Sequence, residues 1–231
     1  MRVLIALNAY EEDGPGVLIY GLCQRLVPIG GLTLSTVALS RPGPLADRFR
    51  DLGVGAEFLD TRRRGGFRRF KQWARQLAKS AERPDIIHTN LLWPDLAFRM
   101  VEDELEGIPI LSTCHGLHAF QEKGKLRGAA YAMVEKWSRK KCAGWVAVSQ
   151  HVAQTMRERG YPEARIHMVL NGVDCVQNYP LPAHRQSEIR RLLNLKDDAP
   201  LIAAAGTLRQ LKGHDVLIRA MRDVVAEHPQ A

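Results

Sequence analysis

Short apolar runs alternate with segments of helical periodicity along most of the chain. The apolar runs predict β-strands at residues 3–7, 34–39, 56–59, 85–88, 108–113, 145–148 and 166–170. Between them, apolar residues recur every three or four positions and predict helices at residues 17–27, 45–52, 67–81, 96–106, 126–141 and 150–159. Short strands that are apolar throughout and separated by helices are typical of a parallel sheet covered on both faces. The pattern therefore predicts an α/β fold with a Rossmann-like, doubly wound sheet, in which ligands bind at the carboxyl ends of the strands.

The pattern changes after Asp174, where Pro180 and Pro182 signal a linker. Beyond it we expect a helix at 185–195, a strand at 201–205 and a helix at 215–227. We therefore predict a first domain at residues 1–178, a linker and helix at 179–199, and at 200–231 the first β-α unit of a second Rossmann-like domain. The rest of that second domain is expected to lie beyond residue 231.

The net charge of the chain indicates which kinds of molecule it binds. The 231 residues carry a net charge of +8, which favours phosphate-bearing substrates, anionic lipid headgroups or nucleic acid. No apolar run approaches the roughly 18 residues that span a bilayer, and the N-terminus is too short and polar for a secretory signal. The 4 cysteines and 8 histidines show no metal-ligand spacing. We expect a cytoplasmic protein without a metal site.

Much of the positive charge falls in a basic block from Arg62 to Lys71. Phe67, Phe70, Leu77 and Ala81 share one stripe of the predicted helix, and we expect this stripe to pack on the sheet. The arginines suit an anionic membrane surface, so the protein is expected to act peripherally at the inner face of the membrane. Basic patches with aromatics also bind nucleic acid, but no nucleic-acid motif accompanies this one, and we expect no such partner.

The turn after the first strand contains Gly14 and Gly16. A glycine-rich turn at a helix N-terminus can hold an anion. The turn lacks the Gly-x-Gly-x-x-Gly fingerprint of dinucleotide-binding folds, which disfavours NAD. A plain turn fits these residues as well as a binding loop does.

Other polar residues follow the later strands. His88 and Asn90 end the fourth strand, and His115 and His118 follow the fifth. His115 is placed either to donate a hydrogen bond to a substrate hydroxyl or phosphate, or to cap the strand end. Ser149 follows the sixth strand, where the cap of a helix N-terminus is the favoured role. Such a cap is compatible with an anionic ligand beside it.

The last third of the chain holds a second candidate anion site. An Asn171-Gly172-Val173-Asp174 turn precedes a predicted strand, which ends at Gly206. Arg209 and Lys212 lie between Gly206 and the glycine that begins the next helix. Flexible backbone, free helix N–H groups and cations together are suited to a phosphate.

In this order and spacing, the segments resemble the group-1 (family-4) retaining glycosyltransferases of the GT-B fold. The most specific of them are Val146-Ala147-Val148-Ser149, Asn171-Gly172-Val173-Asp174, and the segment from Gly206 to Asp215. The resemblance covers nearly the whole chain and implies two facing Rossmann-like domains. The first would hold the acceptor and the second a UDP- or GDP-linked sugar donor.

The resemblance also implies roles for individual residues. Lys212 matches the family lysine that contacts the donor diphosphate, with Arg209 in the same loop, and His115 matches the family histidine near the donor sugar. We assign further donor contacts to Gly16, Ser149, Asn171 and Gly206, and acceptor contacts to Gly14, His88, Asn90 and His118. The family is thought to retain anomeric configuration without a protein nucleophile and without a metal cofactor. In two respects the sequence departs from the family, because Thr207 stands where an arginine is common and the paired glutamates would lie beyond residue 231.

We therefore expect part of an enzyme that transfers a sugar from a nucleotide donor to a glycan or lipid-linked acceptor of the cell envelope. This chain by itself is expected to be inactive and to bind UDP or GDP in the millimolar range at best. Two alternatives stay open at this point. One is a non-catalytic module that binds an acceptor or a membrane, and the other is another GT-B enzyme such as a sugar-nucleotide epimerase.

Overall fold

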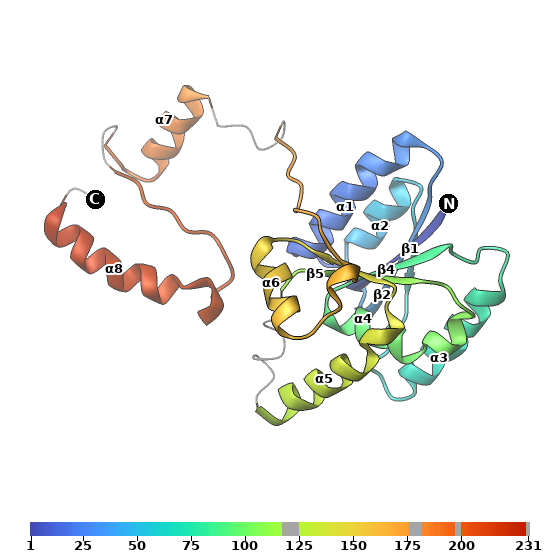
Figure 1. The fold of residues 1–231 in the computed structure, drawn as a ribbon. Helices are drawn as coiled ribbons and strands as arrows, with labels where there is room; N and C mark the ends of the chain where they lie inside the picture. Colours follow the sequence, from blue (N-terminus) through green and yellow to red (C-terminus); the bar gives the residue numbers. More distant parts are fainter. Residues whose placement is uncertain (117–124, 176–181, 197–199, 230–231) are drawn as a thin grey trace. The chain divides into compact units, whose positions relative to one another are not determined.

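The computed structural model describes residues 1–116, 125–175, 182–196 and 200–229. The chain divides into two compact units, Met1–Gly172 and Val173–Ala231 (Figure 1). The predicted domain boundary at residue 178 lies outside the described residues, so the domain division stays a prediction.

A seven-stranded parallel sheet forms the centre of the first unit. Its strands are β1 (Arg2–Ala9), β2 (Thr33–Arg41), β3 (Gly55–Phe58), β4 (Ile86–Asn90), β5 (Ile110–Cys114), β6 (Gly144–Ala147) and β7 (Ile166–Met168). They lie in the order β3-β2-β1-β4-β5-β6-β7. The order reverses between β1 and β4, where Ala6 is paired with Thr89. This confirms the predicted doubly wound fold and places its switch point at the ends of these two strands.

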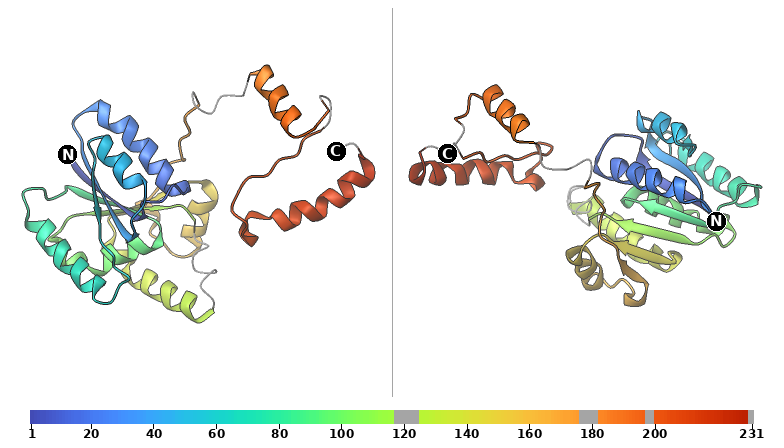
Figure 2. Two further views of the ribbon diagram at one scale, coloured as in Figure 1. Left: turned by 180° about the vertical axis from the view of Figure 1, so that it is seen from behind. Right: turned by 90° about the horizontal axis from the view of Figure 1, so that it is seen from above.

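Helices cover the sheet on both faces. They are α1 (Gly14–Leu26), α2 (Leu45–Asp51), α3 (Gly66–Lys79), α4 (Leu92–Met100), α5 (Lys125–Ser138) and α6 (Gln150–Glu158). In Figures 1 and 2, α1 and α2 lie together on one side of the sheet, and α3, α4 and α5 lie on the other. The buried apolar residues accordingly form two clusters, one on each side of β1, because successive side chains of a strand point to opposite faces.

The predicted apolar stripe of α3 packs as expected. Phe70, Ala74 and Ala78 are buried, and the Phe70 ring meets Phe98 of α4 edge to face with ring centres 5.0 Å apart. Ala81, which we had placed on the same stripe, is exposed and lies beyond the end of the helix. Core packing is therefore confirmed for the helix, though not for its last predicted residue.

The helix predicted at 96–106 begins earlier and ends earlier. α4 starts at Leu92 and includes Pro94, and a short 3-10 helix (Glu102–Leu105) follows it. Proline is tolerated in the first turn of a helix because the N–H groups there have no partner within the helix, so the helix can include Pro94. The helix therefore begins directly at the end of β4.

A buried network of charges joins α4 to α5. The Arg99 side chain is fully buried and donates from Nε to Oδ1 of Asp95 over 3.0 Å and from Nη1 to Oγ of Ser138 over 3.3 Å. Arg139 pairs with Glu135, Nη2 to Oε2, over 2.6 Å. Each buried charge thus has an opposite charge beside it, and this attraction offsets the free-energy cost of removing the charges from water.

The second unit contains α7 (Ala183–Leu192) and α8 (His214–Glu227), close to the two helices predicted there. The strand predicted at 201–205 is wrong, because these residues form no strand. A strand is stabilised by hydrogen bonds to a neighbour, and within the described part of Val173–Ala231 no other strand is present to pair with it. Leu201 and Ile202 accordingly remain about half exposed.

Candidate functional site

His115 and Asn90 meet at the carboxyl ends of two neighbouring strands. β4 ends at Asn90 and β5 ends one residue before His115. The His115 Nε2 atom lies 3.2 Å from Oδ1 of Asn90, whose side chain is fully buried. An amide oxygen can only accept, so the ring must donate its Nε2 proton, which leaves Nδ1 as its acceptor atom. The pairing fixes both the tautomer and the orientation of the imidazole.

Both histidines of this edge are held neutral. His88 lies two residues further into β4, and its Nε2 atom is 2.6 Å from Oγ1 of Thr113. Burial lowers the pKa of His88 to about 4, and the neighbouring His115 adds to that effect. Burial also lowers the pKa of His115, while the carboxylate of Asp13 opposes the shift. At neutral pH the edge therefore offers uncharged imidazoles, which can donate to or accept from a sugar hydroxyl.

The turn between β1 and α1 contains an acidic residue where an anion was predicted to bind. Oδ1 of Asp13 accepts the N–H of Gly16 over 2.8 Å and caps α1. A side chain at Gly16 would place its Cβ 2.3 Å from the carbonyl oxygen of Glu11, so the tight packing of this turn requires glycine there. Gly14, in contrast, has open space around it. The helix N-terminus already has a carboxylate ligand of its own, and the donor and acceptor roles of these glycines stay predictions.

Ser149 caps α6 as its position predicted, since its Oγ accepts the N–H of Val152 over 3.1 Å. Asn171 is exposed and lies close to the end of the first unit. His118 lies outside the described residues. The proposed substrate contacts of all three residues stay predictions.

In the second unit, the predicted phosphate loop is a tight bend in front of α8. A 3-10 turn (Gln210–Lys212) leads into Gly213, whose φ of 67° is the left-handed conformation that glycine adopts readily. The side chain of Lys212 folds against Gly206, since a Cβ there would lie 3.5 Å from Lys212 Cγ. Nε2 of His214 is buried beside Gly206 and has no hydrogen-bond partner among the described residues. A glycine, a lysine and an unpaired ring nitrogen thus lie together at a helix N-terminus.

Sequence reasoning missed a further group of residues at the strand ends, which we call the Arg62 cluster: Asn8, Ser40, Thr61, Arg62 and Trp93. The guanidinium of Arg62 donates from Nη2 to Oδ1 of Asn8 over 3.3 Å, and Ser40 donates to the same oxygen over 2.9 Å. The Trp93 ring centre lies 5.9 Å from the guanidinium, and Trp93 Nε1 donates to Thr61 over 2.9 Å. Asn8 and Ser40 lie near the ends of β1 and β2, Thr61 and Arg62 follow β3, and Trp93 follows β4. That shared position is the signal that could have revealed them.

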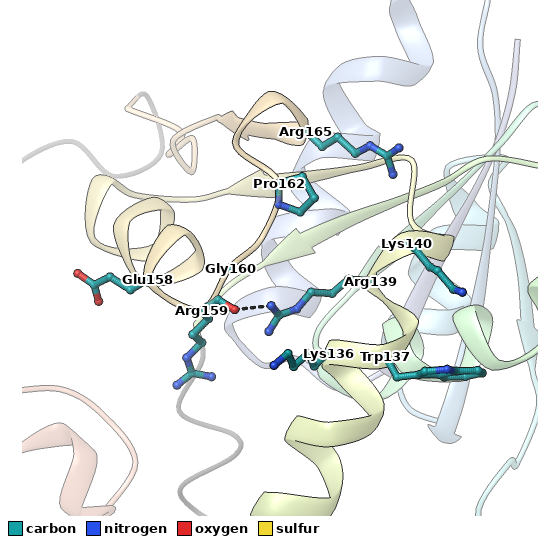
Figure 3. Close-up of a pocket in the computed structure, with 9 residues that line it drawn as sticks. All are labelled: Lys136, Trp137, Arg139, Lys140, Glu158, Arg159, Gly160, Pro162 and Arg165. Atoms are coloured by element: carbon teal, nitrogen blue, oxygen red, sulfur yellow. Dashed lines mark hydrogen bonds between the residues drawn. The ribbon is translucent and has the colours of Figure 1, made fainter.

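A basic pocket of about 620 Å³ lies where α5 and α6 end. It is lined by Lys136, Trp137, Arg139, Lys140, Glu158, Arg159, Gly160, Pro162 and Arg165, and Figure 3 shows cationic side chains around it. Arg139 donates to the carbonyl of Arg159, and Arg165 donates to the carbonyl of Cys142 over 3.1 Å. These arginines satisfy carbonyl groups near the helix C-termini. Because both helices lead into the next strand here, the pocket lies at the amino ends of the strands, opposite His115.

No helix in the described ranges is long and apolar enough to cross a bilayer. In the same part of the chain, no three histidine, cysteine, aspartate or glutamate side chains are grouped as they would be around a metal ion.

Comparison with known proteins gives concordant matches. Residues 13–177 match the sequence profile of Glycosyltransferase Family 4. YtcC of Bacillus subtilis is 35% identical over 89 residues, which are 36% of this chain and 22% of YtcC. The alpha-maltose-1-phosphate synthase of Mycolicibacterium smegmatis is 25% identical over 151 residues, 62% of this chain and 38% of that enzyme.

Among solved structures, Anabaena HepE in complex with UDP and glucose superposes with a TM-score of 0.73 at 14% identity. The match covers 96% of this chain and 57% of HepE. At this identity the match shows a shared fold. In each of the three comparisons the chain spans less than two thirds of the other protein.

Proposed function

The chain belongs to glycosyltransferase family 4, and on that premise we propose that it forms the acceptor side of an enzyme that transfers a sugar from a nucleotide donor. The observation that carries the proposal is the His115–Asn90 pair at the carboxyl ends of adjacent central strands. This is where a doubly wound sheet binds its ligand. HepE, which shares the fold, was crystallised with UDP and glucose, which supports a UDP-linked donor, and a GDP-linked donor is the second candidate.

His115 is proposed to lie against the donor sugar. Its proton is committed to Asn90, so Nδ1 is the atom that would accept a hydrogen bond from a sugar hydroxyl. A neutral ring is required for this task, because protonation would turn Nδ1 into a second donor and remove the acceptor. Asn90 holds the ring through its hydrogen bond with Nε2, and Asn90, His88, Gly14 and His118 form the proposed acceptor side.

Lys212 and Arg209 are proposed to bind the donor diphosphate, with Gly206, Gly16, Ser149 and Asn171 as further donor contacts. When the glycosidic bond breaks, negative charge grows on the leaving diphosphate, and positioned cations stabilise that charge by several kcal/mol. The same diphosphate would then assist attack by the acceptor hydroxyl from its own side, which retains the anomeric configuration. Cations and helix N–H groups would neutralise the phosphates without a metal ion.

The acceptor is proposed to be a glycan or a lipid-linked sugar of the cell envelope, handled by a cytoplasmic enzyme at the membrane surface. Arg63, Arg64 and Arg68 of the basic block are exposed, and each cation near an anionic bilayer contributes about 1 kcal/mol. Sedimentation with vesicles tests this point. Binding to phosphatidylglycerol vesicles should exceed binding to phosphatidylcholine vesicles and fall when these arginines are replaced by glutamine, and equal binding to both would contradict it.

The transfer activity is tested in the product of the complete reading frame that contains this sequence. UDP- and GDP-linked hexoses are offered in water, and donor hydrolysis is followed by UDP or GDP release. Lys212→Ala should slow release by about 10²-fold or more, whereas Lys196→Ala, a matched lysine exposed elsewhere in the same unit, should not. Proton NMR of the freed sugar at early times reports its anomeric configuration.

Three results would overturn this proposal. Equal rates for the two lysine variants would remove the assigned role of Lys212. An inverted anomer would exclude the retaining mechanism. An epimerised nucleotide sugar, with no nucleotide released, would assign the fold to epimerase chemistry instead.

A further inference from the structure

The Arg62 cluster holds a cation at the same edge of the sheet as His115. Its side chain reaches back over the strand ends, where Asn8 of β1 accepts one of its protons. A guanidinium carries five N–H donors, and with one weak hydrogen bond of 3.3 Å most of those of Arg62 have no acceptor within the described part of the chain. The central carbon of the guanidinium lies over the Trp93 ring, 5.9 Å from the ring centre, so the indole occupies one side of the group.

The backbone before α3 is built to hold Arg62 in this place. Oδ1 of Asp60 accepts the N–H groups of both Arg62 and Arg63 over 3.1 Å, which closes the turn after β3. Gly66 packs so tightly against the Asp60 carbonyl oxygen that a Cβ would lie 2.0 Å from it. The turn is therefore fixed by backbone contacts, and the direction of the Arg62 side chain follows from it.

The charge of Arg62 is not balanced locally. Across the described residues, no carboxylate lies within 4.0 Å of its guanidinium, whereas Arg41 pairs with Glu11 and Arg48 pairs with Glu12 on the elements beside it. The arginine that reaches over the strand ends therefore lacks, among the described residues, the acidic partner that these two arginines have. A positioned guanidinium with open donors is suited to a planar or tetrahedral anion.

The position of Arg62 relative to His115 limits the size of the ligand. Asn8 lies on β1, Asn90 on β4 and His115 after β5, three neighbouring strands of the sheet. Adjacent strands are about 4.8 Å apart, so the Asn8 and His115 positions lie roughly 10 Å from one another across the edge. This spacing matches a sugar or polyol whose reacting hydroxyl is at one end and whose anionic group is at the other.

We propose that Arg62 binds an anionic group, a phosphate or a carboxylate, of the acceptor whose hydroxyl is glycosylated near His115. The inference rests on the proposed transferase function and adds the chemical class of the acceptor. Asn8 and Trp93 are positioning residues in it, because they act on the ligand only through the guanidinium. A neutral glycan acceptor would leave the Arg62 donors unmatched.

The test uses the indole N–H signals of the isotope-labelled chain, titrated with inorganic phosphate and with glycerol 1-phosphate against sodium chloride of equal ionic strength. Trp93 reports the Arg62 cluster, Trp137 reports the basic pocket, and buried Trp145 reports folding. We expect both phosphates to shift the Trp93 signal in a saturable way. Arg62→Gln should weaken this binding at least tenfold, and Arg63→Gln, the exposed neighbour in the same turn, should change it less than twofold.

The remaining outcomes are equally decisive. Arg62→Lys keeps the charge without the planar fork and takes the place of Arg62→Gln if that variant fails to fold. Phosphate binding by Arg62→Lys that is weaker than that of the wild type supports the inference, and binding equal to that of the wild type contradicts it. A shift confined to Trp137 would place the anion in the basic pocket and overturn it, and so would equal losses for the two glutamine variants. Donor hydrolysis in the complete protein requires no acceptor. If hydrolysis occurs and phosphate leaves Trp93 unchanged, the anionic acceptor is refuted while the transferase function stands.

Discussion

The hydrogen bond between His115 and Asn90 allows a direct test of the site without any substrate. Asn90→Asp replaces the amide by a carboxylate of the same shape. The carboxylate oxygen then lies 3.2 Å from Nε2 of His115, where the amide oxygen lies in the wild type. In the wild-type chain, burial holds the pKa of His115 below its usual range. With the carboxylate present the protonated ring gains a partner, so the pKa of His115 should rise above that of the wild type.

The size of the effect follows from the distance. With an effective dielectric constant of about 20, unit charges 3.2 Å apart attract by about 5 kcal/mol. At about 1.4 kcal/mol per pKa unit this corresponds to nearly 4 units. Asn90 is fully buried, so placing a charge there costs part of that energy, and opposite charges in proteins raise or lower a pKa by about 1–3 units. We expect a rise in the pKa of His115 by about 2 units.

Histidine titration of the labelled chain by NMR measures the shift. Asn171→Asp, the same substitution at an exposed position, serves as control and should leave the pKa of His115 unchanged. The stability contributed by the new ion pair is complete below the unfolded pKa of about 6.5 and is lost as the pH rises through the raised folded value. An unchanged His115 titration in a folded Asn90→Asp chain would refute the pairing on which the site is built.

Three further predictions concern stability, measured by urea unfolding with tryptophan fluorescence, which reports the first unit because all 4 tryptophans lie in it. Arg99→Met should lower the free energy of unfolding by about 3–5 kcal/mol, because it leaves buried carboxylates without a cation. Arg75→Met, in an exposed ion pair, should lower it by less than about 1 kcal/mol, and similar losses for the two variants would contradict the buried network. Because the pKa of His88 is lowered to about 4, the wild type should lose up to about 3 kcal/mol as the pH falls from 6.5 to 4, and His88→Gln should remove that part of the slope. Gly16→Ala should destabilise by about 1–3 kcal/mol because its Cβ meets a carbonyl oxygen 2.3 Å away, whereas Gly14→Ala, in open space, should be tolerated.

The sheet could be predicted, and a candidate site assigned to its carboxyl edge, because both follow from local patterns. Runs such as that of β1, which is apolar on both faces, indicate a strand buried on both sides, and strands separated by helices must be parallel. Parallel strands bring their carboxyl ends to one edge, and for that reason Asn90 and His115, each at the end of a strand, were both chosen as candidate site residues. Their hydrogen bond was not predicted, because it depends on the strand order that places β4 beside β5 and on a register in which Asn90 lies opposite Thr113.

Other features depend on partners that a local pattern does not contain. The residues at 201–205 have the composition of a strand, but a strand forms only where another strand pairs with it. The glycines of the turn before α1 fitted a plain turn as well as an anion-binding loop. Asp13, in the same turn, caps the helix with its own carboxylate, and glycine at position 16 lets the Glu11 carbonyl approach.

The basic block shows why a run of like charges should be divided at its glycines. Gly65 adopts a φ of 74° and ends the turn, and α3 begins at Gly66. Cations after this point, such as Arg68, follow helical periodicity and lie on the outer face. Arg62 lies before it, where Asp60 reverses the chain and directs the side chain toward the strand ends. One stretch of sequence thus supplies a solvated helix surface and a candidate substrate contact, and the backbone conformation at two glycines separates the two roles.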